Sequence, residues 1–182
     1  MKLHVPKAAK KNCSKCAYET LPHACPINRG YAQRMISGYE EDLKKASYTA
    51  KQVSNPEDSL HACAKNANMI SGVNCNPDPY EAEYNFRMTH NDWHDKTIKT
   101  YAIVVTQTFP KDITDAHMVN GLGQTLAASI AIGHEAAVYT HCSDDCILYN
   151  YIVINNVSAD TGRVVTISAL RNAKELLLDG KY

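Results

Sequence analysis

The sequence lacks long hydrophobic runs and a net charge, and each absence limits the kinds of partner that we expect. No apolar run in the 182 residues approaches the ~20 residues that a transmembrane helix needs, so we expect no membrane partner. The basic N-terminus has no apolar stretch of the kind a secretory signal requires, which predicts a cytoplasmic protein. The charges of the 19 basic and 19 acidic residues in the whole sequence cancel. The overall charge therefore neither indicates nor excludes a nucleic-acid partner.

The sequence also lacks an even cysteine count, since it has seven. Without a secretory signal we expect thiols rather than a disulfide framework. Four residues near the N-terminus have the spacing C-x2-C-x6-H-x-C, which is compatible with a tetrahedral zinc site. They are Cys13, Cys16, His23 and Cys25. The alternative is a set of unrelated thiols in a flexible lead-in, and the spacing alone leaves both open.

Composition is typical of a soluble globular protein, with 45% hydrophobic and 21% charged residues. We divide the chain into a lead-in over residues 1–30 and one folded domain over residues 31–182. Lys10 and Lys11 belong to a basic arm in the lead-in that could contact phosphate. A solvated terminus without a partner is the alternative.

Local patterns in the first half of the chain predict helices joined by loops. Four-residue apolar spacing predicts a helix over residues 27–51, and residues 57–68 are expected to be partly helical. Gly, Asn and Pro indicate a loop over residues 71–80. Pro79 suits the first turn of a helix that extends to Met88.

The second half alternates strand-like and helix-like segments. An apolar residue at every fourth position predicts an amphipathic helix after an N-cap at Thr114 and before a C-cap at Gly133. Around it we expect strands at 101–109, 135–140, 149–157 and 164–167, a turn at 158–163, and a helix from 168 to about 178. The fold class is therefore α+β, with an antiparallel or mixed sheet covered by helices.

Four blocks resemble, in order, those of the relaxase or mobilisation-nuclease domain of conjugative and mobilisable plasmids, an HUH endonuclease family. The blocks are SNPEDS (54–59), MISGVNCNPD (69–78), TQTFPKDIT with GLGQTLA (106–127), and GHEAAVYTH through YNYIVINNVSADTGR (133–163). The resemblance implies a relaxase-like fold and a histidine triad holding Mg²⁺ or Mn²⁺. It also implies a tyrosine that attacks a phosphodiester of single-stranded DNA.

The resemblance assigns the metal and DNA roles to particular residues. His141 matches the family's first metal-ligand histidine, and Asp144 or Asp145 matches the acid that follows it. Asn155 matches the asparagine that closes the motif and is a DNA-binding candidate.

The sequence departs from the family at the remaining ligand positions. Two of the family's histidines fall on Tyr149 and Tyr151, with one extra residue between them and the first histidine. Val104 replaces another histidine often found in the family. Tyrosine is protonated at neutral pH and is a poor ligand for metals that imidazole suits, so a normal three-histidine site cannot form.

The nucleophile position also departs from the family. The family's tyrosine falls on Gln52, which cannot attack phosphorus. Tyr48 lies one helical turn earlier on the predicted helix and is the substitute candidate, with Tyr39 and Tyr31 more distant. For each tyrosine the alternative is a packing role.

Two other metal arrangements stay open. The first is a zinc site built from residues around the predicted turn, namely His141, Cys142, Asp145 and Cys146. The second is the pair His90 and His94, spaced for one face of a helix. The alternatives are thiols packed as small apolar groups and plain surface histidines.

Two functions follow from the resemblance. One is a relaxase-like nickase of single-stranded DNA with impaired catalysis. The other is a non-catalytic or vestigial module that keeps the relaxase fold and binds single-stranded DNA or an origin hairpin, with other mobilisation proteins as further partners. Because the departures are spread across the site, we expect impaired or lost catalysis. A third hypothesis does not use the resemblance. It describes the protein as an α+β binding domain with an N-terminal zinc loop.

Overall fold

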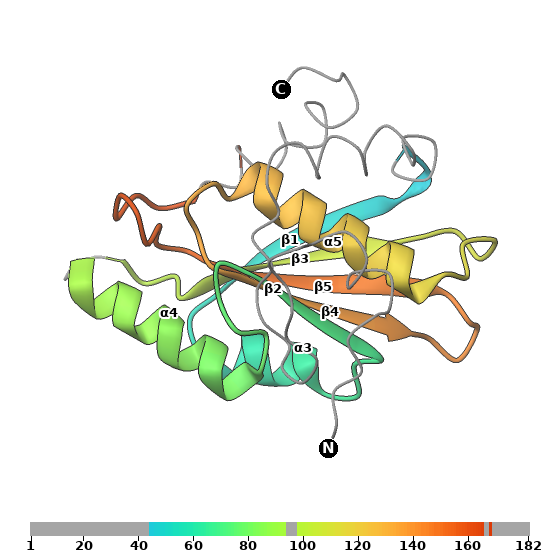
Figure 1. Ribbon diagram of the computed structural model, residues 1–182, viewed down its shortest axis with the longest axis horizontal. Helices are drawn as coiled ribbons and strands as arrows, with labels where there is room; N and C mark the ends of the chain where they lie inside the picture. Colours follow the sequence, from blue (N-terminus) through green and yellow to red (C-terminus); the bar gives the residue numbers. More distant parts are fainter. Residues whose placement is uncertain (1–43, 94–97, 166–167, 169–182) are drawn as a thin grey trace, which may run out of the picture.

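The fold is a five-stranded sheet with helices on both faces, seen here in a computed structural model that describes residues 44–93, 98–165 and 168. The strand order is β1-β3-β5-β4-β2, and every pairing is antiparallel. Figure 1 shows α5 on one side of the sheet and α4 with α3 on the other. The predicted α+β class is confirmed, with an antiparallel sheet.

The strands and helices have clear sequence causes. The central strands are rich in β-branched residues, which pack well on a pleated surface, whereas α5 carries a repeated apolar stripe. The strands are β1 (Ser47–Val53), β2 (Met69–Val73), β3 (Ala102–Thr108), β4 (Ala136–Cys142) and β5 (Leu148–Asn155). The helices are the π-helical turn η1 (Glu57–His61), α3 (Ala62–Ala64), α4 (Pro79–Trp93) and α5 (Ala116–Ile130).

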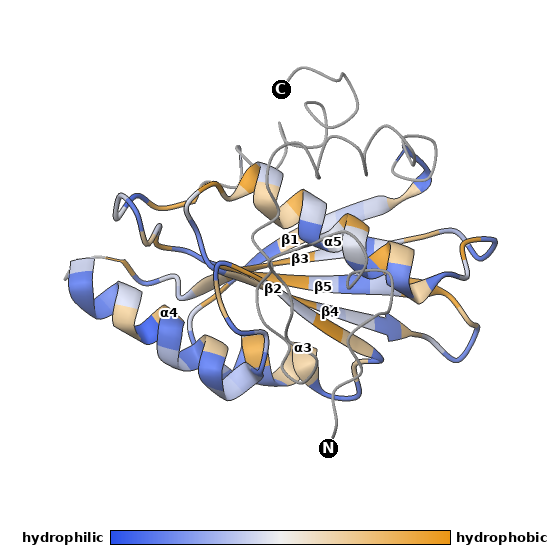
Figure 2. Cartoon of the chain, in the orientation of Figure 1, coloured by the Kyte–Doolittle hydropathy of each residue, from blue (hydrophilic) through white to orange (hydrophobic). Residues whose placement is uncertain are grey.

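Each face of the sheet has its own apolar core. On the α5 face, Leu122 and Leu126 pack with Ile103, Ile152 and Ile154. Helix α5 lies over β5, β4 and β2. Figure 2 shows the hydrophobic residues concentrated along the strands, while α4 is mostly hydrophilic.

The second core lies on the opposite face of the sheet. Leu60 of η1 and Phe86 of α4 are fully buried there, and they belong to one cluster with Val104, Tyr139 and Val153. This core is built on one half of the second face. The other half, toward the turn between β4 and β5, carries polar and aromatic side chains.

A row of polar side chains, which we call the amide row, crosses the sheet beneath α5. Asn150 Nδ2 donates to Gln107 Oε1 at 2.8 Å, and Thr140 Oγ1 donates to Asn150 Oδ1 at 2.7 Å. Asn120 Nδ2 of α5 donates to Thr140 Oγ1 at 2.9 Å. Gln107 Nε2 donates to the Tyr48 hydroxyl at 3.4 Å. Apart from Tyr48, the row is buried, so these bonds satisfy groups that would be costly to leave unpaired.

Several predictions about the elements are confirmed. Residues 101–109 contain β3, the amphipathic stripe forms α5, and residues 57–68 contain η1 and α3. Pro79 begins α4, which extends past Met88 to Trp93. The strand pair around His141 is β4 and β5.

The helix predicted over residues 27–51 is wrong from Ser47 onward, although Lys44 and Lys45 are helical. Residues Ser47–Val53 form the edge strand β1, paired with β3 along its whole length. The segment SYTAKQV gains backbone hydrogen bonds from a buried neighbouring strand, and this pairing overrides a weak helical spacing. The loop predicted at 71–80 is also partly wrong, because β2 extends to Val73.

The predicted ends of α5 and one predicted strand need correction. Asp115, rather than Thr114, caps α5, and its carboxylate accepts from His117 N at 2.9 Å. The helix ends at the C-cap Ala131, before Gly133. In place of the strand predicted at 164–167, the described residues show a single bridge between Val157 and Val164. Of the helix predicted from 168 to about 178, the structure describes Ser168, which is helical, and the remainder lies outside the described residues.

Within the described ranges, no helix is both long enough and apolar enough to cross a membrane. The lead-in, with Lys10, Lys11 and the Cys13, Cys16, His23 and Cys25 set, lies outside those ranges.

We predict that Gly123→Ala destabilises the fold. A Cβ there would lie 2.6 Å from Asn150 Nδ2 and 2.7 Å from Val138 Cγ1. Alanine gains about 1 kcal/mol of helix propensity over glycine, but overpacking a core costs about 1–3 kcal/mol. Urea unfolding should show a net loss of about 1 kcal/mol. Gly121→Ala, at a partly exposed position of the same helix, is the control and should be neutral or stabilising; a stabilised Gly123→Ala would contradict the tight contact.

Candidate functional site

The positions matched to the metal ligands lie together on the second face of the sheet. His141 of β4 is paired with Tyr149 of β5, and Tyr139 is paired with Tyr151. Directly paired residues of antiparallel strands project to the same face, and residues two apart on a strand share a face. The fold therefore brings His141, Tyr149 and Tyr151 together, as their alignment with the family predicts.

The three side chains form an aromatic cluster. The His141 ring stacks on Tyr149, with centroids 5.2 Å apart and planes 13° apart. Tyr151 meets His141 edge-on at 5.3 Å and Tyr149 edge-on at 5.3 Å. His141 is buried, while both tyrosines are partly exposed. Rings thus fill the space in which imidazole nitrogens would have to converge on an ion.

His141 has a hydrogen-bond partner of its own. Its Nε2 lies 2.8 Å from the carbonyl oxygen of Cys63 in α3. A carbonyl only accepts, so Nε2 carries a proton and donates it. The bond attaches β4 to α3 and leaves Nδ1 as the ring nitrogen of His141 that could bind a metal.

Lys51 of β1 is a charged residue of the same face. It pairs with Val104, which in turn pairs with Val153 two residues from Tyr151. Its positive charge acts on Cys63, whose thiol pKa burial nevertheless raises to about 11. Sequence reasoning missed Lys51 because its segment was assigned to a helix. The alternation in SYTAKQV, taken as a strand, would have placed it on this face.

The acids that match the family motif lie in the turn between β4 and β5. Asp144 and Asp145 are both exposed, and the turn is closed by the Cys146 N–H donating to the Ser143 carbonyl at 2.9 Å. Burial, chiefly, and then neighbouring groups including Tyr151 and Asp144 raise the pKa of the Tyr149 phenol. A phenol is already neutral near neutral pH, and this environment favours the neutral form of Tyr149 further.

The residues present do not fit a metal site. Among the described ranges there is no group of three His, Cys, Asp or Glu side chains placed to hold an ion. This includes the arrangement of His141, Cys142, Asp145 and Cys146, which is not brought together. His90 donates from Nε2 to the Tyr101 carbonyl at 3.1 Å and to Asn155 Oδ1 at 3.0 Å, while His94 lies outside the described residues.

The nucleophile candidates of β1 lie on the other face. Tyr48 is paired with Gln107 and Gln52 with Ile103, both of which belong to the α5 side. Burial raises the pKa of the Tyr48 phenol. The prediction that Tyr48 lies on a helix is wrong, and the sheet separates it from His141. Tyr31 and Tyr39 lie outside the described residues.

Two other motif positions are interior. Val104 is buried in the second core. Asn155 is fully buried, and its Nδ2 donates to Glu135 Oε2 at 2.7 Å while its Oδ1 accepts from the Val157 N–H at 3.1 Å. Thr89 of α4 donates to the same Glu135 oxygen at 2.9 Å. Asn155 therefore joins β5 to the start of β4 and to α4, and its amide has no group facing solvent.

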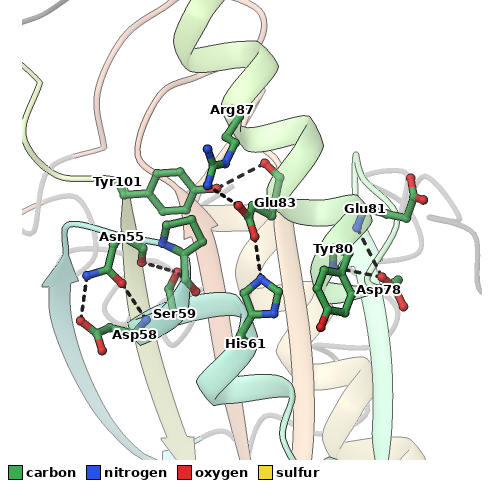
Figure 3. Close-up of polar contacts among 11 residues, drawn as sticks. Asn55, Asp58, Ser59, His61, Asp78, Tyr80, Glu81, Glu83, Arg87 and Tyr101 are labelled. Carbon is green, nitrogen blue, oxygen red and sulfur yellow. Dashed lines mark hydrogen bonds and ion pairs between the residues drawn. The ribbon is translucent and has the colours of Figure 1, made fainter.

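The SNPEDS block has a structural explanation. Asn55 Oδ1 accepts from the Asp58 N–H at 2.8 Å, and Ser59 Oγ donates to the Asn55 carbonyl at 3.0 Å, which starts η1 (Figure 3). Glu83 of α4 lies with its Oε2 2.6 Å from His61 Nε2, and it also forms an ion pair with Arg87. The block thus starts η1, and His61 at the end of η1 attaches it to α4.

Comparisons with known proteins give one family match and several relatives. A family described as "Relaxase: MobA/VirD2-like, nuclease domain" matches residues 48–177. A Protein rlx of Staphylococcus aureus is 34% identical over 105 residues, which is 58% of this chain and 31% of that protein. Another Protein rlx of the same species is 35% identical over 105 residues, 58% of this chain and 32% of that protein. The chain thus spans about a third of the length of these curated relatives. No solved structure matches it significantly.

We predict that Glu83→Gln destabilises the protein at neutral pH more than in acid. The hydrogen bond from His61, chiefly, lowers the pKa of Glu83 below its usual 4.5. A carboxyl with a lowered pKa contributes stability above 4.5, and this is lost as the pH falls through the folded-state value. The difference in melting temperature between wild type and variant should shrink below pH 4.5.

Glu81→Gln is the matched control. This exposed glutamate of the same helix points away from His61 and Glu83 (Figure 3). A pH-independent difference for Glu83→Gln would contradict the ionic contribution.

Proposed function

The chain belongs to the MobA/VirD2-like relaxase family, and from that premise we propose that this domain binds single-stranded DNA without cleaving it. The observation that carries the proposal is the aromatic cluster of His141, Tyr149 and Tyr151. It stands where the family resemblance expects three imidazoles, and it contains one imidazole and two phenols.

The chemistry of strand cleavage is poorly served by the described residues. Transesterification needs charge stabilisation at the phosphate and an aligned nucleophile on the same side. Neutral phenols provide no comparable charge, and burial raises the pKa of Tyr149. Tyr48 is on the far side of the sheet and hydrogen-bonded to Gln107.

DNA binding depends on different features, which remain in this chain. Phosphate contacts from lysines act additively and need no precise convergence. Lys51 is exposed on the face of the aromatic cluster, and we include Lys10 and Lys11 of the lead-in as further phosphate contacts. The proposal also includes a cytoplasmic location and a single folded domain over residues 31–182. It further includes a zinc site in the N-terminal lead-in and other mobilisation proteins as partners.

We predict salt-sensitive DNA binding without covalent attachment. The protein is incubated with labelled single-stranded DNA from the cognate transfer origin, with Mn²⁺ or with EDTA. Binding by fluorescence anisotropy should be equal in both conditions and should weaken steeply with salt. A denaturing gel should show no shifted species. A covalent adduct that is lost in Tyr48→Phe would instead establish the nickase.

We further predict that the double substitution Asp144→Asn and Asp145→Asn tightens DNA binding. If these exposed acids only repel phosphate, removing two negative charges should raise affinity about threefold or more at low salt. If they served a metal, the substitution would weaken metal-dependent binding. Anisotropy titrations at two salt concentrations measure the effect, and Asp112→Asn, an exposed acid before α5, is the control.

A further inference from the structure

Resting on the proposed function, we infer that bases of single-stranded DNA stack on the rings of Tyr149 and Tyr151. The two tyrosines, with the residues around them on β1 and β3, would form a stacking platform where the family resemblance expects metal ligands. The platform is the half of the second sheet face formed by Ser47, Thr49, Lys51, Thr106, Thr108, Tyr149 and Tyr151.

The two rings are held in place but not enclosed. The imidazole of buried His141 stacks against Tyr149 with its centroid 5.2 Å away, and the Tyr149 side chain remains partly exposed. Tyr151 lies edge-on to Tyr149 at 80° and is also partly exposed. Rigid aromatic side chains lose little conformational freedom on binding, which favours stacking with bases of any sequence.

The surrounding side chains suit a nucleic acid better than a protein core. Thr106 pairs with Tyr151 and Thr108 with Tyr149, which places hydroxyls directly beside the rings. Thr49 and Lys51 of the edge strand are exposed on the same face. Hydroxyls can bond to sugars and phosphates, and a lysine neutralises a phosphate.

The charged residues around the platform determine on which side of it the phosphates of a bound strand lie. The β1, β3 and β5 residues of this half-face include no carboxylate, whereas Asp144 and Asp145 are exposed in the turn beyond Tyr149. The phosphates therefore lie toward Lys51 and the β1 edge, with the bases over the tyrosines. This commits the surface to one occupant, a short run of unpaired nucleotides.

The first experiment compares ring removal with ring retention. Anisotropy with a fluorescein-labelled short oligothymidine measures the affinity of the full chain. Tyr149→Leu and Tyr151→Leu should each lower it about tenfold, a typical value for one stacked base, whereas Tyr149→Phe and Tyr151→Phe should bind as the wild type does. Tyr84→Leu, at a tyrosine of α4 that is 61% exposed, is the matched control and should change nothing.

The second experiment removes bases rather than rings, so its main comparison uses the wild type alone and does not depend on a variant folding. An oligonucleotide with central abasic sites keeps its phosphates but cannot stack. The wild type should bind it at least tenfold more weakly than oligothymidine. The double variant Tyr149→Leu with Tyr151→Leu should bind both oligonucleotides equally, because the stacking is already lost.

The outcomes separate this inference from the proposed function. If the wild type binds oligothymidine but the leucine variants bind as tightly, or if abasic sites weaken the double variant as much as the wild type, the stacking platform is overturned while DNA binding stands. If the wild type binds no single-stranded DNA, the proposed function fails and the platform with it. A covalent adduct would overturn the absence of cleavage but leave the stacking measurement intact.

Discussion

The register of β3, β5 and β4 is the constraint on which the rest of the structure depends. Asn150 must face α5, because its amide bonds to Gln107 and to the Val119 carbonyl of that helix. Since side chains alternate along a strand, a one-residue slip would move the amides to the other face and bring tyrosines beneath α5. The amide row therefore fixes Tyr149 and Tyr151 on the face opposite α5.

The same alternation brings the matched positions together, but the side chains that stand there do not fit a metal site among the described residues. The side chains at the matched positions do converge, so the backbone geometry that would assemble a site is present. The difference lies in the atoms presented. Phenol rings pack on His141 and on each other. The Nε2 proton of His141 is donated to the Cys63 carbonyl of α3. The cluster thus joins strands that a bound ion would otherwise bridge.

The sequence predicted the elements with strong periodicity and missed those fixed by pairing. The stripe ending at Ile130 and the unbroken run in β3 were sufficient for a helix and a strand. By contrast, β1 is a polar edge strand whose structure depends on residues about fifty positions away, so its spacing suggested a helix. The helix assignment put Tyr48 one turn from Gln52 as the substitute nucleophile, whereas the strand places Tyr48 on the opposite face of the sheet from His141.

Catalysis and binding differ in how many substitutions each can absorb. Cleavage requires ligands and nucleophile to meet at one phosphate, so replacing two histidines and displacing the tyrosine removes most of the rate together. Binding sums contacts over a surface, and each contact can be exchanged for another of different chemistry. An aromatic ring on a sheet face can cover a base as well as an imidazole can bind an ion. Under the proposed function, a chain without convergent ligand atoms on this face can still bind single-stranded DNA through contacts of other chemistry.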